Sequence, residues 1–159
     1  MKRYTWIVIF ALCIVLCMTG IFYQSTKSQA DSNATSQTVS EKVQPIVDPQ
    51  QKIEPKDFND MLRKVAHGIE FMILGIFLGL LFHQIKKLTG NTYLSCPLLI
   101  SLLTGVTDEF LQSLNDRGSL VKDVLIDFGG AVAGICLIFG IVLVLHQRKQ
   151  RREKYGNSV

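Results

Sequence analysis

Nineteen consecutive residues, 5–23, carry no charged side chain, and the basic residues Lys2 and Arg3 come shortly before them. As an α-helix this run is about 28 Å long, close to the ~30 Å hydrocarbon core of a bilayer. The same run is compatible with a signal peptide, because residues 28–30 form a weak small-x-small cleavage site. It is longer than the apolar part of most signal peptides, so we expect an uncleaved membrane anchor.

Three further apolar blocks follow at residues 65–82, 93–114 and 120–145, and most charged residues lie between the blocks. Hydrophobic residues make up 48% of the chain and charged residues 19%. This arrangement excludes a soluble enzyme of ordinary amphipathic pattern, a disulfide-stapled secreted module and a disordered chain. We expect an all-α fold, an integral membrane bundle of four transmembrane helices with a flexible extracytoplasmic linker after the first.

Glycines recur at helical spacing in two of these blocks. Gly75 and Gly79 form a small-xxx-small pair in the second block, and Gly129, Gly130 and Gly134 lie in the fourth. Such surfaces let two helices approach closely in a membrane. We therefore expect tight helix packing at these glycines.

The segment between the first two blocks is polar and contains Pro45, Pro49 and Pro55. Such a composition buries too little apolar surface to offset the entropy lost on ordering. The expected organisation is an anchor at 1–23, a disordered extracytoplasmic linker at 24–56, a three-helix membrane domain at 57–146 and a basic tail at 147–159.

The placement of basic residues orients the chain. Lys2 and Arg3 precede the first block, Lys86 and Lys87 follow the second, and five more basic residues lie in the tail after residue 146. Lys and Arg close to the membrane favour its cytoplasmic side. We therefore expect a multi-pass protein of the cell membrane with both termini in the cytoplasm.

This topology places ionisable residues of three helices at a similar depth. Glu70, Glu109 and Asp127 each lie five to seven residues inside the outer end of their block, about 8–11 Å below the membrane boundary. Within the helices, Asp108 and Gln112 are four residues apart, as are Asp123 and Asp127, and His67 and Glu70 are three apart, which gives each helix one polar face. With the cation of the short loop at residues 115–119, the candidate residues are His67, Glu70, Asp108, Glu109, Gln112, Arg117, Asp123 and Asp127.

An acid at the centre of a membrane helix costs roughly 2.5–3.5 kcal/mol on insertion scales, and less near an interface. These side chains are therefore expected to face one another, a cation or water. Two interpretations follow from their spacing. They form either an outward-open polar pocket, which is favoured because intramembrane ionisable groups tend to be functional, or an ion-pair network that fixes helix packing.

Three sequence motifs resemble those of the VanZ-like family. The chain reads K-V-A-H at residues 64–67 with E-F at 70–71, and T-D-E-F-L-Q at residues 107–112. It continues with Arg117, with D-V-L-I-D at residues 123–127 and with a Gly/Ala-rich run at residues 129–134. The resemblance covers about residues 57–145, without the first helix or the linker. It departs from the family at Asn115 and Asp116, where relatives often have Pro-Gly, and at Leu111, often aromatic or His in relatives.

The resemblance implies a small polytopic membrane protein. The family's named member is linked to low-level resistance to teicoplanin, a lipoglycopeptide that acts at the outer face of the membrane. The expected function is an effect on cell-envelope properties or lipoglycopeptide susceptibility through an outward-facing polar intramembrane pocket. Its expected partner is a membrane lipid, a lipid-linked envelope precursor or the lipoglycopeptide itself, and the resemblance transfers no catalytic residue.

Two other functions are compatible with the same residues: an intramembrane enzyme acting on a lipid-linked envelope substrate, and a small ion-coupled transporter. The chain has no nucleophile motif, no phosphate loop and no HExxH, which weighs against an enzyme. Four helices would need to dimerise to form a transporter, and a homo-oligomer is compatible with the sequence. A carboxylate cage for a divalent cation is conceivable, but no ligand set is fixed, so we expect no metal, no cofactor and no nucleic-acid partner.

Overall fold

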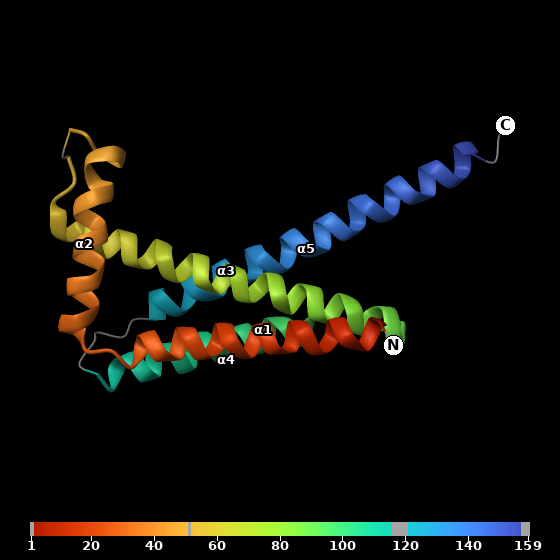
Figure 1. The fold of residues 1–159 in the computed structure, drawn as a ribbon, viewed down its shortest axis with the longest axis horizontal. Helices are drawn as coiled ribbons and strands as arrows, with labels where there is room; N and C mark the ends of the chain where they lie inside the picture. Colours follow the sequence, from red (N-terminus) through yellow and green to blue (C-terminus); the bar gives the residue numbers. More distant parts are fainter. Residues whose placement is uncertain (1, 51, 116–120, 157–159) are drawn as a thin grey trace.

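The computed structural model describes residues 2–50, 52–115 and 121–156. The regular secondary structure of this part of the chain is all helical, which confirms the predicted all-α class (Figure 1). Its helices are α1 (Lys2–Ser25), α2 (Gln29–Val47), α3 (Pro55–Thr89), α4 (Ser95–Ser113) and α5 (Val121–Gly156).

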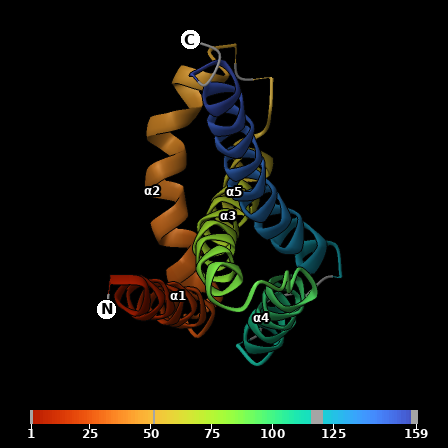
Figure 2. The same cartoon turned by 90° about the vertical axis from the view of Figure 1, so that its right-hand side faces the viewer.

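Four of these helices form a bundle in which successive members run in opposite directions. α1 and α4 lie side by side, while α3 and α5 run the opposite way and cross each other (Figure 1). α2 is set across the end of the bundle at which α1 ends and α3 begins, and it packs on α3 (Figures 1 and 2). The C-terminal part of α5 extends beyond the other helices.

The contact between α3 and α5 is the most extensive in the bundle, and glycines make it possible. A Cβ atom at Gly75 would overlap the carbonyl group of Ala131, and one at Gly134 would lie 2.8 Å from the backbone nitrogen of Ile76. A Cβ at Gly130 would overlap the carbonyl oxygen of Gly68. Small residues allow two helix backbones to approach this closely. Of the predicted glycines, Gly129 has open space around it.

Apolar side chains line the interior of the bundle and also cover much of its outside. Ile14 and Ile21 of α1 pack with Phe71, Leu74 and Leu78 of α3 in a buried core. Large apolar side chains remain exposed along all four helices of the bundle, as expected of a surface that faces lipid rather than water. These exposed side chains include Leu12, Leu16, Ile73, Leu99, Leu103, Phe110, Leu137 and Ile141.

Three helices of the described residues are long and apolar enough to cross a membrane, with candidate spans at Tyr4–Ser25, Pro55–Thr89 and Val121–Glu153. α4 is not among them, so the four-span bundle expected from the sequence is not established. Asp108, Glu109 and Gln112 lie in the last turns of α4 and interrupt its apolar run.

Part of the segment at residues 24–56, which the sequence predicts to be a disordered linker, is helical instead. The structure has helix α2 over Gln29–Val47, with Pro45 inside its last turn. Polar contacts hold α2 in place: Arg63 Nη1 of α3 donates to Asn33 Oδ1 at 2.9 Å, and Gln44 Nε2 donates to the carbonyl of Ile53 at 2.9 Å. The composition of the segment predicts disorder because it contains too few apolar residues to form a core. The contacts that hold α2 are polar, and composition does not reveal them.

α3 begins ten residues before the second apolar block. Pro55 occupies its first turn, where a missing N–H is tolerated, and Asp57 in the same turn is favourable near the positive end of the helix dipole. The helix ends at Gly90, whose φ of 77° and N–H bond to the carbonyl of Lys86 form a left-handed C-cap. The region before the block is therefore continuous with the long helix.

Candidate functional site

Polar side chains from four helices meet at the end of the bundle where α1 ends and α5 begins. Asp108, Glu109 and Gln112 of α4 and Asp127 of α5 are all buried there, with at most 7% of each residue exposed. α3 contributes His67 and Glu70, whose side chains are 21% and 31% exposed. The helices deliver these residues to one place because α1 and α4 end, and α3 and α5 begin, at the same side of the bundle.

Asp108 is at the centre of this polar cluster and is fully buried. Its Oδ1 atom accepts a hydrogen bond from the hydroxyl of Ser25, the last residue of α1. Its Oδ2 atom accepts one from Gln112 Nε2 at 2.7 Å, across one turn of α4. A carboxylate oxygen retains further acceptor capacity after one such bond. The two bonds fix the orientation of Asp108 and leave it able to accept more.

His67 connects Asp108 with Glu70. Its Nδ1 atom lies 4.0 Å from Asp108 Oδ2 and 3.9 Å from Glu70 Oε2. Glu70 Oε1 in turn accepts a hydrogen bond of 2.6 Å from Gln24 Nε2 of α1. A chain of polar contacts therefore runs from α1 through α3 to the buried aspartate of α4.

Asp127 lies beside these residues and is 2% exposed. A ligand atom of each of His67, Asp108 and Asp127 lies within 4.8 Å of the other two. Gly105 of α4 lies next to Asp127: a Cβ there would be 3.7 Å from Asp127 Cβ, an ordinary van der Waals contact. Asp127 therefore lies where α4 and α5 meet.

Asp123 occupies a different position from Asp127, although it lies one turn away on α5. Its Oδ1 atom lies 3.5 Å from the Nζ atom of Lys64, and its side chain is 23% exposed. Lys64 was not among the predicted residues. Asp123 therefore lies at the edge of the cluster, in an ion pair with α3.

The structure thus brings together six of the eight residues singled out in the sequence and sets one at the edge. The predicted cation, Arg117, lies outside the described residues. Gln24 and Ser25 also belong to the polar cluster but were not predicted, because the first apolar block was interpreted as a separate anchor. The sequence does indicate these two residues, because both are polar and directly follow the first apolar block.

Two pockets lie beside the cluster, on the side of α3 that α2 covers. The smaller, of about 170 Å³, reaches His67 and Glu70, and Gln24 also lines it. Lys27 and Arg63 supply positive charge to its wall. The pocket therefore contains groups of both charge signs next to the buried carboxylates.

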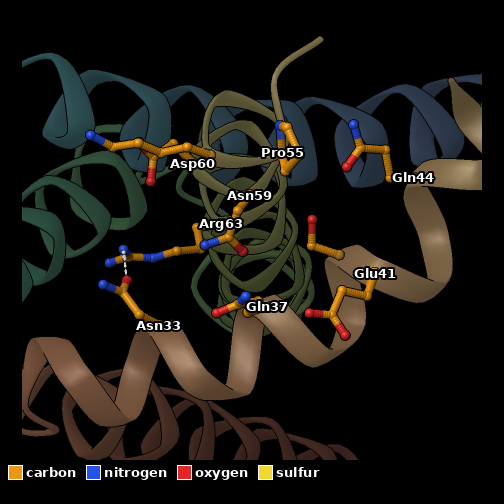
Figure 3. Close-up of a pocket in the computed structure, with 10 residues that line it drawn as sticks. Asn33, Gln37, Glu41, Gln44, Pro55, Asn59, Asp60 and Arg63 are labelled. Atoms are coloured by element: carbon orange, nitrogen blue, oxygen red, sulfur yellow. Dashed lines mark hydrogen bonds between the residues drawn. The ribbon is translucent and has the colours of Figure 1, made fainter. Parts of the chain in front are cut away.

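The larger pocket, of about 390 Å³, lies between α2 and the first turns of α3 (Figure 3). Arg63 lines this pocket too and is hydrogen-bonded there to Asn33. Amide and hydroxyl side chains make up half of its wall, beside two acids and two bases. These uncharged groups are Asn33, Gln37, Ser40, Gln44 and Asn59.

Comparison with known proteins identifies the family. The VanZ/LLP1 family model matches residues 9–145. An uncharacterized protein of Saccharomyces cerevisiae is 36% identical over 83 residues, which cover 48% of this chain and 76% of the yeast protein. No solved structure matches the chain.

The family match begins within α1 and includes α2. It is therefore wider than the resemblance over residues 57–145 that the three motifs carry. This extent agrees with the structure, in which Ser25 of α1 contacts Asp108 of the second motif. The chain belongs to the VanZ/LLP1 family.

Proposed function

We propose that this VanZ/LLP1-family membrane protein alters cell-envelope properties or susceptibility to teicoplanin-type lipoglycopeptides by binding a lipid-anchored ligand. The polar head of the ligand would enter the smaller pocket, and its hydrocarbon part would remain in the bilayer. One observation carries this proposal. The smaller pocket holds groups of both charge signs beside the apolar side chains of Val39 and Leu62.

The charges of the pocket suit a zwitterionic or hydroxylated head group. Lys27 and Arg63 would attract a phosphate or carboxylate, and the planar guanidinium of Arg63 can form two parallel hydrogen bonds with either. Glu70 would accept hydrogen bonds from an ammonium or hydroxyl group. Val39 and Leu62 provide the apolar part of the wall.

The size of the pocket favours a head group over a whole drug molecule. Pockets for drug-sized ligands usually measure about 300–1,000 Å³, and the smaller pocket measures about 170 Å³. A lipid head group or the linkage region of a lipid-linked envelope precursor would fit this volume. The larger pocket of about 390 Å³ could then accept neighbouring sugar or peptide groups, because amides and hydroxyls line it.

We further propose that α4 crosses the membrane as a fourth span, so that both termini are cytoplasmic and both pockets face outward. Its 19 residues are about 28 Å long as a helix, close to the thickness of the hydrocarbon core. α4 also runs alongside α1 (Figure 1). Its residues Asp108, Glu109 and Gln112 are buried among the helices, where membrane proteins tolerate such groups.

The proposal is tested by expressing the chain in a teicoplanin-susceptible bacterium. Glu70→Gln should remove the change in susceptibility while membrane abundance stays at the wild-type level, because a carboxylate of the pocket is replaced by an amide of the same shape. The matched control is Glu153→Gln, which alters an exposed acid of the C-terminal extension that lies 3.8 Å from Lys149. Full activity of Glu70→Gln at normal abundance would contradict the proposal.

A further inference from the structure

We propose that His67, Asp108 and Asp127 bind one divalent cation between α3, α4 and α5. Each residue offers one ligand atom, and these atoms lie within 4.8 Å of one another. Ligand atoms bound at about 2.0–2.2 Å from a metal ion lie at most ~4.4 Å apart across it. Small rotations of the three side chains would therefore complete the coordination. The three ligands come from three different helices, so a bound cation would link α3, α4 and α5.

Asp127 is the residue that most requires a positive partner. It is 2% exposed. Among the described residues, its electrostatic neighbours are the carboxylates of Asp108, Glu109, Asp123 and Glu70, which all repel it when charged. An uncompensated buried carboxylate is strongly destabilising, so such groups are paired or coordinate metals. A divalent cation would compensate Asp127 and Asp108 at once.

His67 supplies a second, independent observation. Its Nδ1 atom is shielded from solvent, and no described residue forms a hydrogen bond with it. This atom lies 4.0 Å from Asp108 Oδ2, too far for a hydrogen bond but suitable for a group placed between them. Neutral imidazole is a common metal ligand. A ring nitrogen of His67 and one oxygen of each carboxylate therefore lie close enough together to share one cation.

The donor set indicates which cation is expected. One imidazole with two carboxylates suits Mn²⁺, Fe²⁺ or Zn²⁺ better than Mg²⁺ or Ca²⁺, which prefer oxygen ligands alone. The sequence alone predicted no metal, because spacing along the chain does not show which acid approaches His67. That approach depends on how α3, α4 and α5 pack.

Neighbouring residues hold one of the ligands in position. Ser25 and Gln112 each donate a hydrogen bond to Asp108, one to each carboxylate oxygen. Partners that orient a metal ligand in this way typically change metal affinity about 10–100-fold when they are removed. α1 would therefore contribute to cation binding through Ser25 without touching the cation.

The test uses the full chain, purified in detergent, stripped of metal with a chelator and titrated with Mn²⁺. We expect one Mn²⁺ per chain by electron paramagnetic resonance, and a spin-echo signal from a nitrogen nucleus directly bound to the ion. His67→Gln should remove the nitrogen signal. The proposal would be overturned if the wild-type protein bound no stoichiometric Mn²⁺, or bound it without the nitrogen signal. Both outcomes are measured on the wild type, so they do not depend on whether a variant folds.

The Mn²⁺ affinities of two variants show whether the cation binds at this site or at other acidic residues of the chain. Asp127→Asn should weaken Mn²⁺ binding by roughly 100-fold or more, since loss of an orienting partner alone costs about 10–100-fold. Asp123→Asn, one turn away on α5 and paired with Lys64, should bind Mn²⁺ like the wild type. Equal affinity of the wild type and Asp127→Asn would overturn the proposal, because Asp127 would then not be a ligand of the cation. The cation site does not depend on which ligand enters the neighbouring pocket, because Mn²⁺ binding is measured without lipid or drug.

Discussion

The hydroxyl of Ser25 donates a hydrogen bond to the carboxylate of Asp108, and so joins the last residue of α1 to the buried centre of the polar cluster. The two residues are 83 positions apart in the chain and both are fully buried. Through this bond, and through the bond from Gln24 to Glu70, the first helix becomes part of the candidate site.

Replacement of Ser25 tests the stabilising effect of this contact. Ser25→Ala removes a donor to a buried carboxylate, and hydrogen bonds to charged groups contribute about 1.5–3 kcal/mol. We expect a clear fall in the melting temperature of the purified protein in detergent. Thr19→Ala is the control, because the Thr19 hydroxyl is exposed and donates a hydrogen bond to the carbonyl of Val15 in its own helix. Equal melting temperatures of Ser25→Ala and wild type would mean that the bond adds no stability.

Retention of the first helix is the second prediction. Because Gln24 and Ser25 contribute to the polar cluster, the mature chain should keep α1 instead of losing it by cleavage after residue 30. Intact-mass measurement of the protein purified from membranes gives the result directly. A mature chain that begins after residue 30, at full activity, would contradict this prediction.

Two adjacent glycines of α5, Gly129 and Gly130, test how closely α3 and α5 pack where they cross. A Cβ at Gly130 would overlap the backbone of Gly68 in α3, whereas a Cβ at Gly129 would meet nothing within 4 Å. We expect Gly130→Ala to destabilise the protein by about 1–3 kcal/mol, as overpacking does. Gly129→Ala should be neutral or stabilise the helix by up to about 1 kcal/mol. Thermal unfolding of both variants in the same detergent measures the difference, and equal effects would show that α3 and α5 are farther apart.

Replacing Asp127 or Asp123 of α5 by asparagine should change the stability of the protein in opposite directions when a chelator is present. Asp127 is surrounded by other carboxylates, so Asp127→Asn should raise the melting temperature by removing repulsion. Asp123→Asn loses the partly exposed pair with Lys64, and such pairs contribute about 0–1 kcal/mol, so a small decrease is expected. If Asp127→Asn instead removed the protein from the membrane, the ion-pair network would be the better interpretation of the cluster.

Membrane topology can be measured with reporter fusions. A fusion after Asp48, which follows α2, should report an extracytoplasmic position, and a fusion at the C-terminus should report a cytoplasmic one. The reason is the basic tail, whose Lys and Arg residues favour the cytoplasmic side. A further fusion within residues 90–94, between α3 and α4, should be cytoplasmic if α4 spans the membrane. Opposite signals from the last two positions would rule out α4 as a span.

The sequence by itself determined the helical class, the apolar helices and the glycine surface, because these depend on residues close together in the chain. Long apolar runs form helices in lipid since only local hydrogen bonding satisfies their backbone. Gly75, Gly130 and Gly134 were identified by spacing alone and lie where α3 and α5 meet. The position of each polar residue along its own helix was also readable, because a helix advances by a fixed rise per residue.

The tertiary structure alone decided which polar residues face each other. Asp123 and Asp127 share a spacing of one turn, yet Asp127 lies beside His67 and Asp108 while Asp123 pairs with Lys64. Helix α2 depends on polar contacts with α3 and its preceding loop, such as that between Arg63 and Asn33. The partnership of Ser25 with Asp108 depends on α1 packing against α4. Each of these contacts joins segments distant in the chain, so local periodicity carries no information about it.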